Sequence, residues 1–192
     1  MQAYHADHNS FPAHAIYKRD AKGQPTQPLL SWRVELLPYL DKEEKELYQK
    51  FNRNLPWDHP DNRKLLSPMP NVYRMVDQVA ADNTTYYQVF VGKDSPFNGP
   101  TPVRVGDVKD GPSNTIGIAE APRAVEWTKP DDIPFVPTPE GFSPSNIGRI
   151  GATEANVVFL DGTVRKLPKL MSAVTLKAMI THNGKEVFQF PD

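Results

Sequence analysis

The chain has 192 residues with 22 Lys and Arg against 23 Asp and Glu, a net charge of −1, so no overall field favours nucleic acid or an anionic membrane surface. It contains no cysteine, which excludes disulfides, thiol catalysis and zinc–thiolate sites. Twenty prolines and 39% hydrophobic residues, with 10% aromatic residues, indicate one ordered, loop-rich unit rather than a disordered chain.

Helical patterns dominate the first third of the chain. Residues 1–9 show helical periodicity that ends at Asn9, and residues 12–28 are predicted to form a polar loop. The opening looks like the last turns of a helix already under way, so we expect a preceding segment. Caps and prolines predict three more short helices: 31–37 with Ser31 as N-cap, 41–51 with Asp41 as N-cap, and one from Pro60 with Asp58 as N-cap.

Strand patterns dominate the rest of the chain. Alternation and aromatic or β-branched residues predict strands over 85–92, 113–120, 156–160 and 163–167. A proline-rich surface loop separates the second strand from the third. A helix is predicted over 172–180, closed by Asn183-Gly184, and residues 187–190 are a candidate last strand. Helices first and antiparallel strands later indicate an α+β fold in one domain, residues 1–192.

The stretch NVVFLDGTVRKL, residues 156–167, is a hairpin signal. Asp161-Gly162 separates two strand-like runs, and Asp-Gly suits a type I′ turn, whose two central residues both need positive φ. We therefore interpret Asp161 and Gly162 as a structural turn that builds the sheet rather than as a reactive site.

The histidines near the N-terminus are the clearest metal candidates. His5 and His8 lie three residues apart on one helical face, with Asp7 and His14 nearby. The Glu that accompanies helical zinc pairs is absent, so solvated polar positions are the preferred interpretation. Because no nucleophile, base and orienting group can be named together, the sequence predicts no catalytic residue, no metal and no cofactor.

Two groups of carboxylates are candidates for catalysis or for calcium binding. Asp131-Asp132, and Asp58 with Asp61, are paired carboxylates, but residues this close in one loop rarely face each other across a sugar as glycosidase chemistry requires. Turn and cap roles explain them more simply. Calcium is the one cofactor kept as an alternative, because three loop carboxylates could join backbone carbonyls around it: Asp107, Asp110 and Asp161.

Two tryptophans in proline-flanked loops are candidates for glycan binding. Trp57 lies in PWD and Trp127 in EWTKP, where exposed rings could stack on sugars while Asp58 and Asp131 bind hydroxyl groups. The alternative, which we prefer, is that both rings anchor their loops to the core.

Seven segments together resemble one known family. In order and spacing, they are similar to the prepilin-like family of unknown function that is abundant in planctomycete bacteria, domain of unknown function 1559. The segments are HADHNSFPA, LSWRVELLPYL, LYQKFNRNLPWDHPDNRKLL, YYQVFVG, GPSNTIGIAEA, VEWTKPDDIPF and NVVFLDGTVRKL. The resemblance covers essentially the whole chain, and Gly151 stands where the family often has a histidine.

The resemblance implies a pilin-like architecture. Family members begin with a prepilin cleavage segment and a long apolar helix, so this chain would be an extracytoplasmic head in the cell envelope or periplasm, anchored by a missing upstream helix that packs on the sheet. Its implied partners are other pilin-like subunits or secretion machinery, as in type IV pili and type II secretion, with no nucleic acid. We expect a non-enzymatic structural protein; the alternative is a carbohydrate- or solute-binding module on the cell surface.

Overall fold

The computed structural model describes residues 1–75, 81–138 and 143–191. Its five α-helices are α1 (Gln2–His8), α2 (Trp32–Glu35), α3 (Lys42–Lys50), α4 (Pro60–Arg63) and α5 (Ala173–Ile180). Its strands are β1 (Ala15–Arg19), β2 (Pro25–Ser31), β3 (Thr84–Gln88), β4 (Phe90–Val91), β5 (Ile116–Glu126), β6 (Ile133–Pro134), β7 (Glu154–Phe159) and β8 (Val164–Pro168). Short 3₁₀ turns are η1 (Leu37–Tyr39), η2 (Asn71–Tyr73), η3 (Val105–Asp107) and η4 (Pro144–Asn146).

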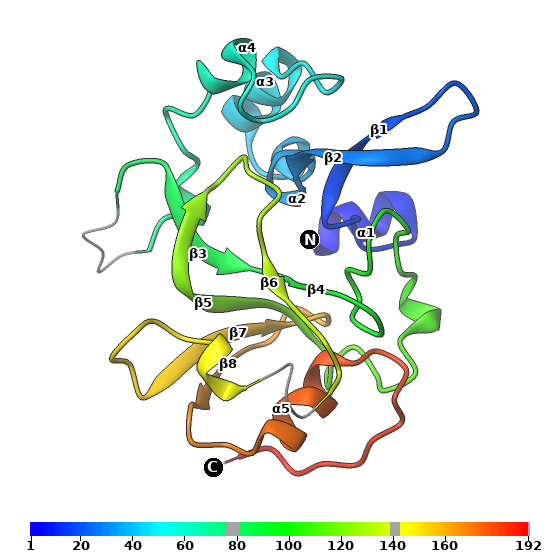
Figure 1. The fold of residues 1–192 in the computed structure, drawn as a ribbon, viewed down its shortest axis with the longest axis vertical. Helices are drawn as coiled ribbons and strands as arrows, with labels where there is room; N and C mark the ends of the chain where they lie inside the picture. Colours follow the sequence, from blue (N-terminus) through cyan, green and yellow to red (C-terminus); the bar gives the residue numbers. More distant parts are fainter. Residues whose placement is uncertain (76–80, 139–142, 192) are drawn as a thin grey trace.

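A four-stranded antiparallel sheet in the order β3-β5-β7-β8 forms the centre of the molecule (Figure 1). Along β7, Ala155, Val157 and Phe159 are each 1% exposed and pack in one core with α5, whereas Asn156 and Val158 point to the opposite face. The sheet therefore has a face covered by α5 and a second face, which we call the outer face.

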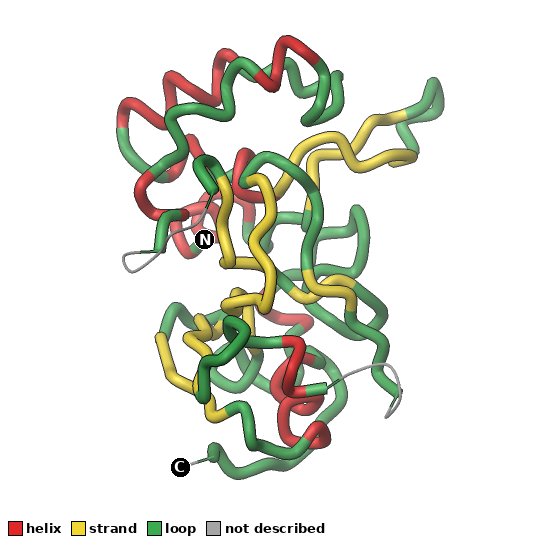
Figure 2. The backbone as a smooth tube through the Cα atoms, turned by 60° about the vertical axis from the view of Figure 1, so that its left-hand side comes forward, coloured by secondary structure: helices red, strands yellow, loops and turns green. Residues whose placement is uncertain are grey.

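A second hydrophobic core joins the N-terminal helices to the strands. It contains Trp32, Val34 and Leu37 from α2 and η1, together with Trp127 from the loop after β5. Figure 2 shows the strands between the helices of the N-terminal part and α5 at the opposite end. The predicted α+β fold with a short N-terminal helix is confirmed.

Most predicted helices are confirmed with nearly the expected caps. The Ser31 hydroxyl accepts from the Arg33 N–H, and the Asp41 carboxylate caps α3 by accepting from two N–H groups. Residues 31–37 split into α2 and η1 because Pro38 interrupts the α-helix. The predicted cap of α4 is wrong, since His59 and not Asp58 accepts from the first helical turn.

The polar loop predicted over 12–28 is wrong, because β1 and β2 form an antiparallel hairpin there. Its turn is closed by the Asp20 carboxylate, which accepts from the N–H groups of Lys22 and Gln24, while Gly23 adopts φ +77°. Figure 1 shows the hairpin projecting from the body of the molecule, so its polar side chains are compatible with a strand.

The strand predicted over 85–92 breaks at Val89. β3 pairs with β5, but Val89 donates its N–H to the Asp132 carboxylate, and β4 then pairs in parallel with β6. A Cβ added at Gly92 would lie 1.8 Å from the Phe135 carbonyl oxygen, so only glycine allows this close approach of β4 and β6.

The turn after β7 differs from the predicted type I′ turn. Gly162 alone has positive φ, at +93°, and the bonds from Gly162 N to Phe159 O and from Phe159 N to Thr163 O close a three-residue loop. This arrangement is a type I turn followed by a left-handed residue, the second common hairpin connection. The Asp161 carboxylate accepts from Thr163, so the predicted structural role of the turn is retained.

The C-terminal predictions are partly correct. α5 matches the helix predicted over 172–180, with Ser172 as its N-cap and Ile180 as its last residue, but its C-cap is Thr181 rather than Asn183-Gly184. Residues 187–190 are irregular rather than a strand. Of the proline-rich loop, Trp127, Ile133 and Phe135 are buried, whereas residues 139–142 lie outside the described part of the chain.

Candidate functional site

A groove of about 350 Å³ runs along the outer face of the four-stranded sheet. Ten of its eleven lining residues are apolar or aromatic, from α2, η2, the strands and the positions on either side of η1, together with Met1 at the start of α1. They are Met1, Trp32, Leu36, Leu40, Val72, Tyr73, Tyr87, Ile118, Asn156, Val158 and Val164. The groove is therefore an apolar surface on a sheet face that water also reaches.

The floor of the groove is a cross-strand row. Ile118 on β5 pairs with Val158 on β7, and Val158 pairs with Val164 on β8. Side chains at directly opposed positions lie on the same face of a sheet, so these three form a continuous strip. Val164 remains 67% exposed at the edge of the strip.

Met1, the N-cap residue of α1, lines the groove. Burial lowers the pKa of the Met1 amino group, because the groove disfavours a charged group at this position. The amide of Gln2 donates to the Leu160 carbonyl at 2.5 Å, so α1 is fastened to the turn between β7 and β8.

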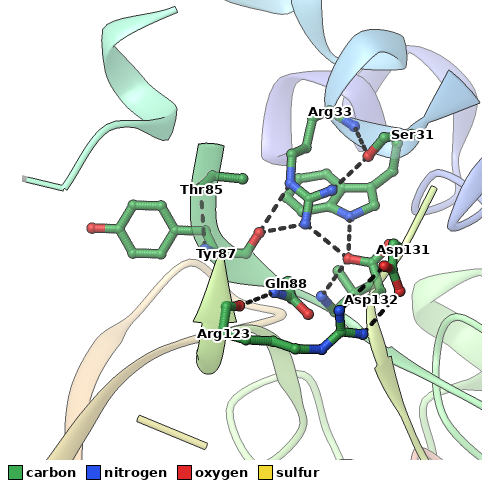
Figure 3. A network of polar contacts seen from close by, with 10 residues as sticks. Ser31, Arg33, Thr85, Tyr87, Gln88, Arg123, Asp131 and Asp132 are labelled. Carbon is green, nitrogen blue, oxygen red and sulfur yellow. Dashed lines mark hydrogen bonds and ion pairs between the residues drawn. The ribbon is translucent and has the colours of Figure 1, made fainter. Parts of the chain in front are cut away.

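A buried polar network supports the wall of the groove (Figure 3). The Arg33 guanidinium donates to the Tyr87 carbonyl from Nε at 2.9 Å and from Nη2 at 2.6 Å, and to the Ser31 hydroxyl at 2.7 Å. Its Nη2 also lies 2.9 Å from the Asp132 carboxylate, and both side chains are 0% exposed. This ion pair connects α2 with β3 and with the segment before β6.

One oxygen of Asp132 accepts hydrogen bonds from three donors in two parts of the chain. Its Oδ1 accepts from Trp32 Nε1 at 3.1 Å, from Arg33 Nη2 at 2.9 Å and from Val89 N at 3.1 Å. Burial raises the pKa of Asp132, and the charge of Arg33 and the bond from Trp32 act against that rise. Oδ2 of Asp132 has no hydrogen-bond partner among the described residues.

The network positions groove residues rather than contacting a ligand itself. It holds the Trp32 ring through Nε1 and the backbone of Tyr87 through its carbonyl, while the Tyr73 hydroxyl donates to the Arg33 carbonyl at 2.8 Å. All three of these aromatic residues line the groove. The shape of the groove therefore depends on a pair of charges beneath it.

Sequence reasoning missed this pair, although the chain contains a signal for it. Arg33 is the one basic residue in the mostly apolar run from Leu29 to Leu40, which also contains Ser31 and Glu35. A charge within such a run indicates a buried partner, because an unpaired buried charge is costly. The identity of the partner, 99 residues away, could not be inferred from local pattern.

Of the residues proposed for glycan binding, Trp127 is buried, whereas Lys129 Nζ links Trp57 and Asp131, lying 5.5 Å from the Trp57 ring and 3.0 Å from the Asp131 carboxylate. Trp127 is 0% exposed and donates from Nε1 to the Leu66 carbonyl, so its ring offers no face to a ligand. Trp57 is partly buried, and its ring is covered by Arg63 and Lys129 at 5.7 and 5.5 Å. Asp58 is exposed nearby. This arrangement favours the loop-anchoring interpretation for Trp127.

The two adjacent carboxylates Asp131 and Asp132 lie in different surroundings. Asp131 lies at the surface, where Lys129 at 3.0 Å and Arg123 at 3.2 Å bind it. Burial acts to raise the pKa of Asp131, but the bonds from Lys129 and Arg123 together lower it. Since Asp132 is buried against Arg33, the two carboxylates do not act as a pair.

The histidines and loop carboxylates considered for metals also have separate partners. His8 Nε2 lies 2.7 Å from the Tyr39 hydroxyl, and His14 Nδ1 lies 3.1 Å from that of Tyr17. Asp110 accepts from two backbone N–H groups near the C-terminus, and Asp161 accepts from its own turn. In the ranges that the structure describes, no group of three or more His, Cys, Asp or Glu could hold a metal ion.

Comparison with known proteins finds a similarity over the N-terminal part of the chain. Residues 1–74 match the model of a family described as protein of unknown function (DUF1559). The match confirms the resemblance over these residues, which include α1 to η2 and the groove wall at Trp32 and Tyr73. No curated protein and no solved structure matches the chain. Within the described residues, every helix is too short or too polar to cross a bilayer.

Proposed function

We propose that this chain is the head of a pilin- or pseudopilin-like surface protein, in which an apolar helix joined to the start of α1 lies on the outer face of the sheet. The protein is structural rather than catalytic, it works outside the cytoplasm, and it assembles with similar subunits or with secretion machinery. The apolar row of Ile118, Val158 and Val164 beside Met1 carries this proposal.

Two further observations support it. An antiparallel sheet face turned to water is normally polar, whereas this one is apolar where it meets α1. The Gln2 side chain also donates to the Leu160 carbonyl, which holds the start of α1 beside the turn between β7 and β8. The polar network around Arg33 is sealed from solvent, which fits a scaffold rather than a reactive centre.

The first test is the genetic sequence that precedes Met1. We expect it to encode a Gly-terminated leader and about twenty apolar residues, the length that spans a bilayer as a helix. A reading frame that begins at Met1, with nothing apolar before it, would refute the proposal.

The second test is disulfide cross-linking in the extended protein. The natural chain has no cysteine, so a single cysteine placed in the upstream helix can pair only with an introduced partner. Val164→Cys in the groove should cross-link, whereas Val174→Cys, 78% exposed on α5, serves as the control and should not. Equal cross-linking at both positions would show that the helix does not occupy the groove.

A further inference from the structure

A second hollow, of about 220 Å³, lies where α1, β1, α2 and the loop after β4 meet. It shares no lining residue with the groove. Two tyrosines, one carboxylate, one guanidinium group and several small apolar side chains line it: Tyr4, Ala13, Ala15, Ile16, Tyr17, Arg19, Glu35, Pro100 and Pro102.

Glu35, the last residue of α2, is the carboxylate in the lining of this hollow. Its side chain accepts a hydrogen bond from the Tyr48 hydroxyl, and within the described ranges no basic group comes within ion-pair distance of it. Burial raises the pKa of Glu35, with Arg53 and His8 acting against the rise. A carboxylate accepts about four hydrogen bonds, so Glu35 retains acceptor capacity for a ligand.

The two tyrosines supply hydroxyl groups and apolar ring surface. Burial, together with the charge of Glu35, raises the pKa of Tyr4 to about 12, and burial also raises the pKa of Tyr17. Both hydroxyls are therefore neutral donors at ordinary pH. The Tyr4 ring stacks on His8 at 4.2 Å, and the Tyr17 hydroxyl lies 3.1 Å from His14 Nδ1, so neighbouring groups hold both side chains.

The lining of this hollow carries one positive and one negative charge. Arg19 is exposed at the rim of the hollow and carries one positive charge, and Glu35 carries one negative charge deeper inside. A single anion or cation would meet one attractive and one repulsive group, whereas a neutral molecule with several hydroxyl groups can donate to Glu35 and accept from Arg19. The alanines and prolines cover the carbon-bound hydrogens of such a molecule.

We infer that this hollow binds one neutral sugar unit, with Glu35 accepting from its hydroxyl groups, Arg19 and the tyrosine hydroxyls donating to it, and Pro100 and Pro102 packing on its apolar face. The volume is below the 300 Å³ or so at which pockets take drug-sized ligands, so it suits one monosaccharide. The inference does not depend on the proposed anchor helix, because the two sites use different residues.

The test is a nuclear magnetic resonance titration of the isotope-labelled protein with D-glucose, D-galactose and D-mannose. We expect at least one sugar to shift the amide signals of residues around Glu35 and Arg19, with a dissociation constant on the order of 1 mM. Glu35→Gln should weaken that binding about tenfold, since it replaces a charged acceptor by a neutral one. Arg19→Gln should also weaken it, and because Arg19 Nη1 donates to the Gly23 carbonyl in the β1–β2 turn, circular dichroism should first show that this variant keeps the fold.

Two controls make the outcome decisive. Glu46→Gln removes an exposed carboxylate on α3, away from the lining of the hollow, and should leave sugar binding unchanged. Glycine and acetate, as a zwitterion and an anion, should cause no shifts in the hollow. The inference is overturned if no sugar shifts these signals at tens of millimolar, if the shifts lie elsewhere, if Arg19→Gln binds as well as the natural protein, or if glycine or acetate binds there instead.

Discussion

The buried pair of Arg33 and Asp132 allows a quantitative prediction of stability. Asp132→Asn keeps the size of the side chain and an acceptor for Trp32 Nε1 and Val89 N, but it removes the negative charge beside a fully buried guanidinium group. Breaking a buried pair in this way costs about 3–5 kcal/mol, because the remaining charge is uncompensated. That loss is a large fraction of the stability of an ordinary domain.

The two partners should respond differently to pH. Arginine keeps its proton and residue 132 no longer titrates in Asp132→Asn, so the stability of this variant should not depend on ionisation at this position as the pH falls. In Arg33→Met, Asp132 is left buried without its partner, and its folded pKa is then raised above the unfolded value of about 3.9. The loss in Arg33→Met should be largest at neutral pH and should shrink as the pH falls through the folded pKa, because the neutral carboxyl tolerates burial.

Urea unfolding followed by tryptophan fluorescence measures these changes at about pH 7 and about pH 4. The double variant Arg33→Met with Asp132→Asn should be more stable than Asp132→Asn alone, because it removes the unpaired charge. The reasoning fails if Asp132→Asn lies within about 1 kcal/mol of the natural protein, or if the loss in Arg33→Met is the same at both pH values.

Three further perturbations test other parts of the fold. Trp127→Ala should lower the free energy of unfolding by about 3–5 kcal/mol in urea melts, and Trp57→Ala, at a partly exposed ring, by clearly less; equal losses would contradict the burial of Trp127. Gly92→Ala should cost about 1–3 kcal/mol in thermal melts, because its Cβ would meet the Phe135 carbonyl; an unchanged melting temperature would contradict this. The free energy of unfolding should fall as the pH rises from about 10 towards 12, because Tyr4 ionises in the unfolded chain while its raised pKa keeps it neutral in the folded protein. Tyr4→Phe should make that fall smaller in circular dichroism titrations.

Caps and alternation predicted the elements whose stabilisation is local. Ser31, Asp41 and Ser172 cap helices within a few residues of themselves, so their roles can be read from neighbouring positions. The hairpin around Gly162 was predicted correctly for the same reason, but the predicted turn type was wrong. A type I′ turn and a three-residue loop both favour glycine at the left-handed position, and the sequence does not separate them.

The features that the sequence did not predict depend on contacts between residues that are far apart in the chain. The break at Val89 depends on a hydrogen bond to Asp132, 43 residues away. On β5, a register shift between Ile116 and Ile118 places the former in the core beside α5 and the latter beside the groove, although simple alternation would put both on one face. The groove floor and the identity of the partner of Arg33 therefore could not be inferred from local pattern.

The outer face of the sheet is divided at Asn156, and this division bears on what covers it. On one side of Asn156 the face is apolar, with Val158 and Val164 beside Met1. On the other side a polar hollow of about 300 Å³ begins, and there Glu120, 3% exposed, accepts from both the N–H and the side-chain amide of Asn156. The proposed upstream helix, which joins α1 at Met1, would cover only the apolar half and would leave the polar half to water.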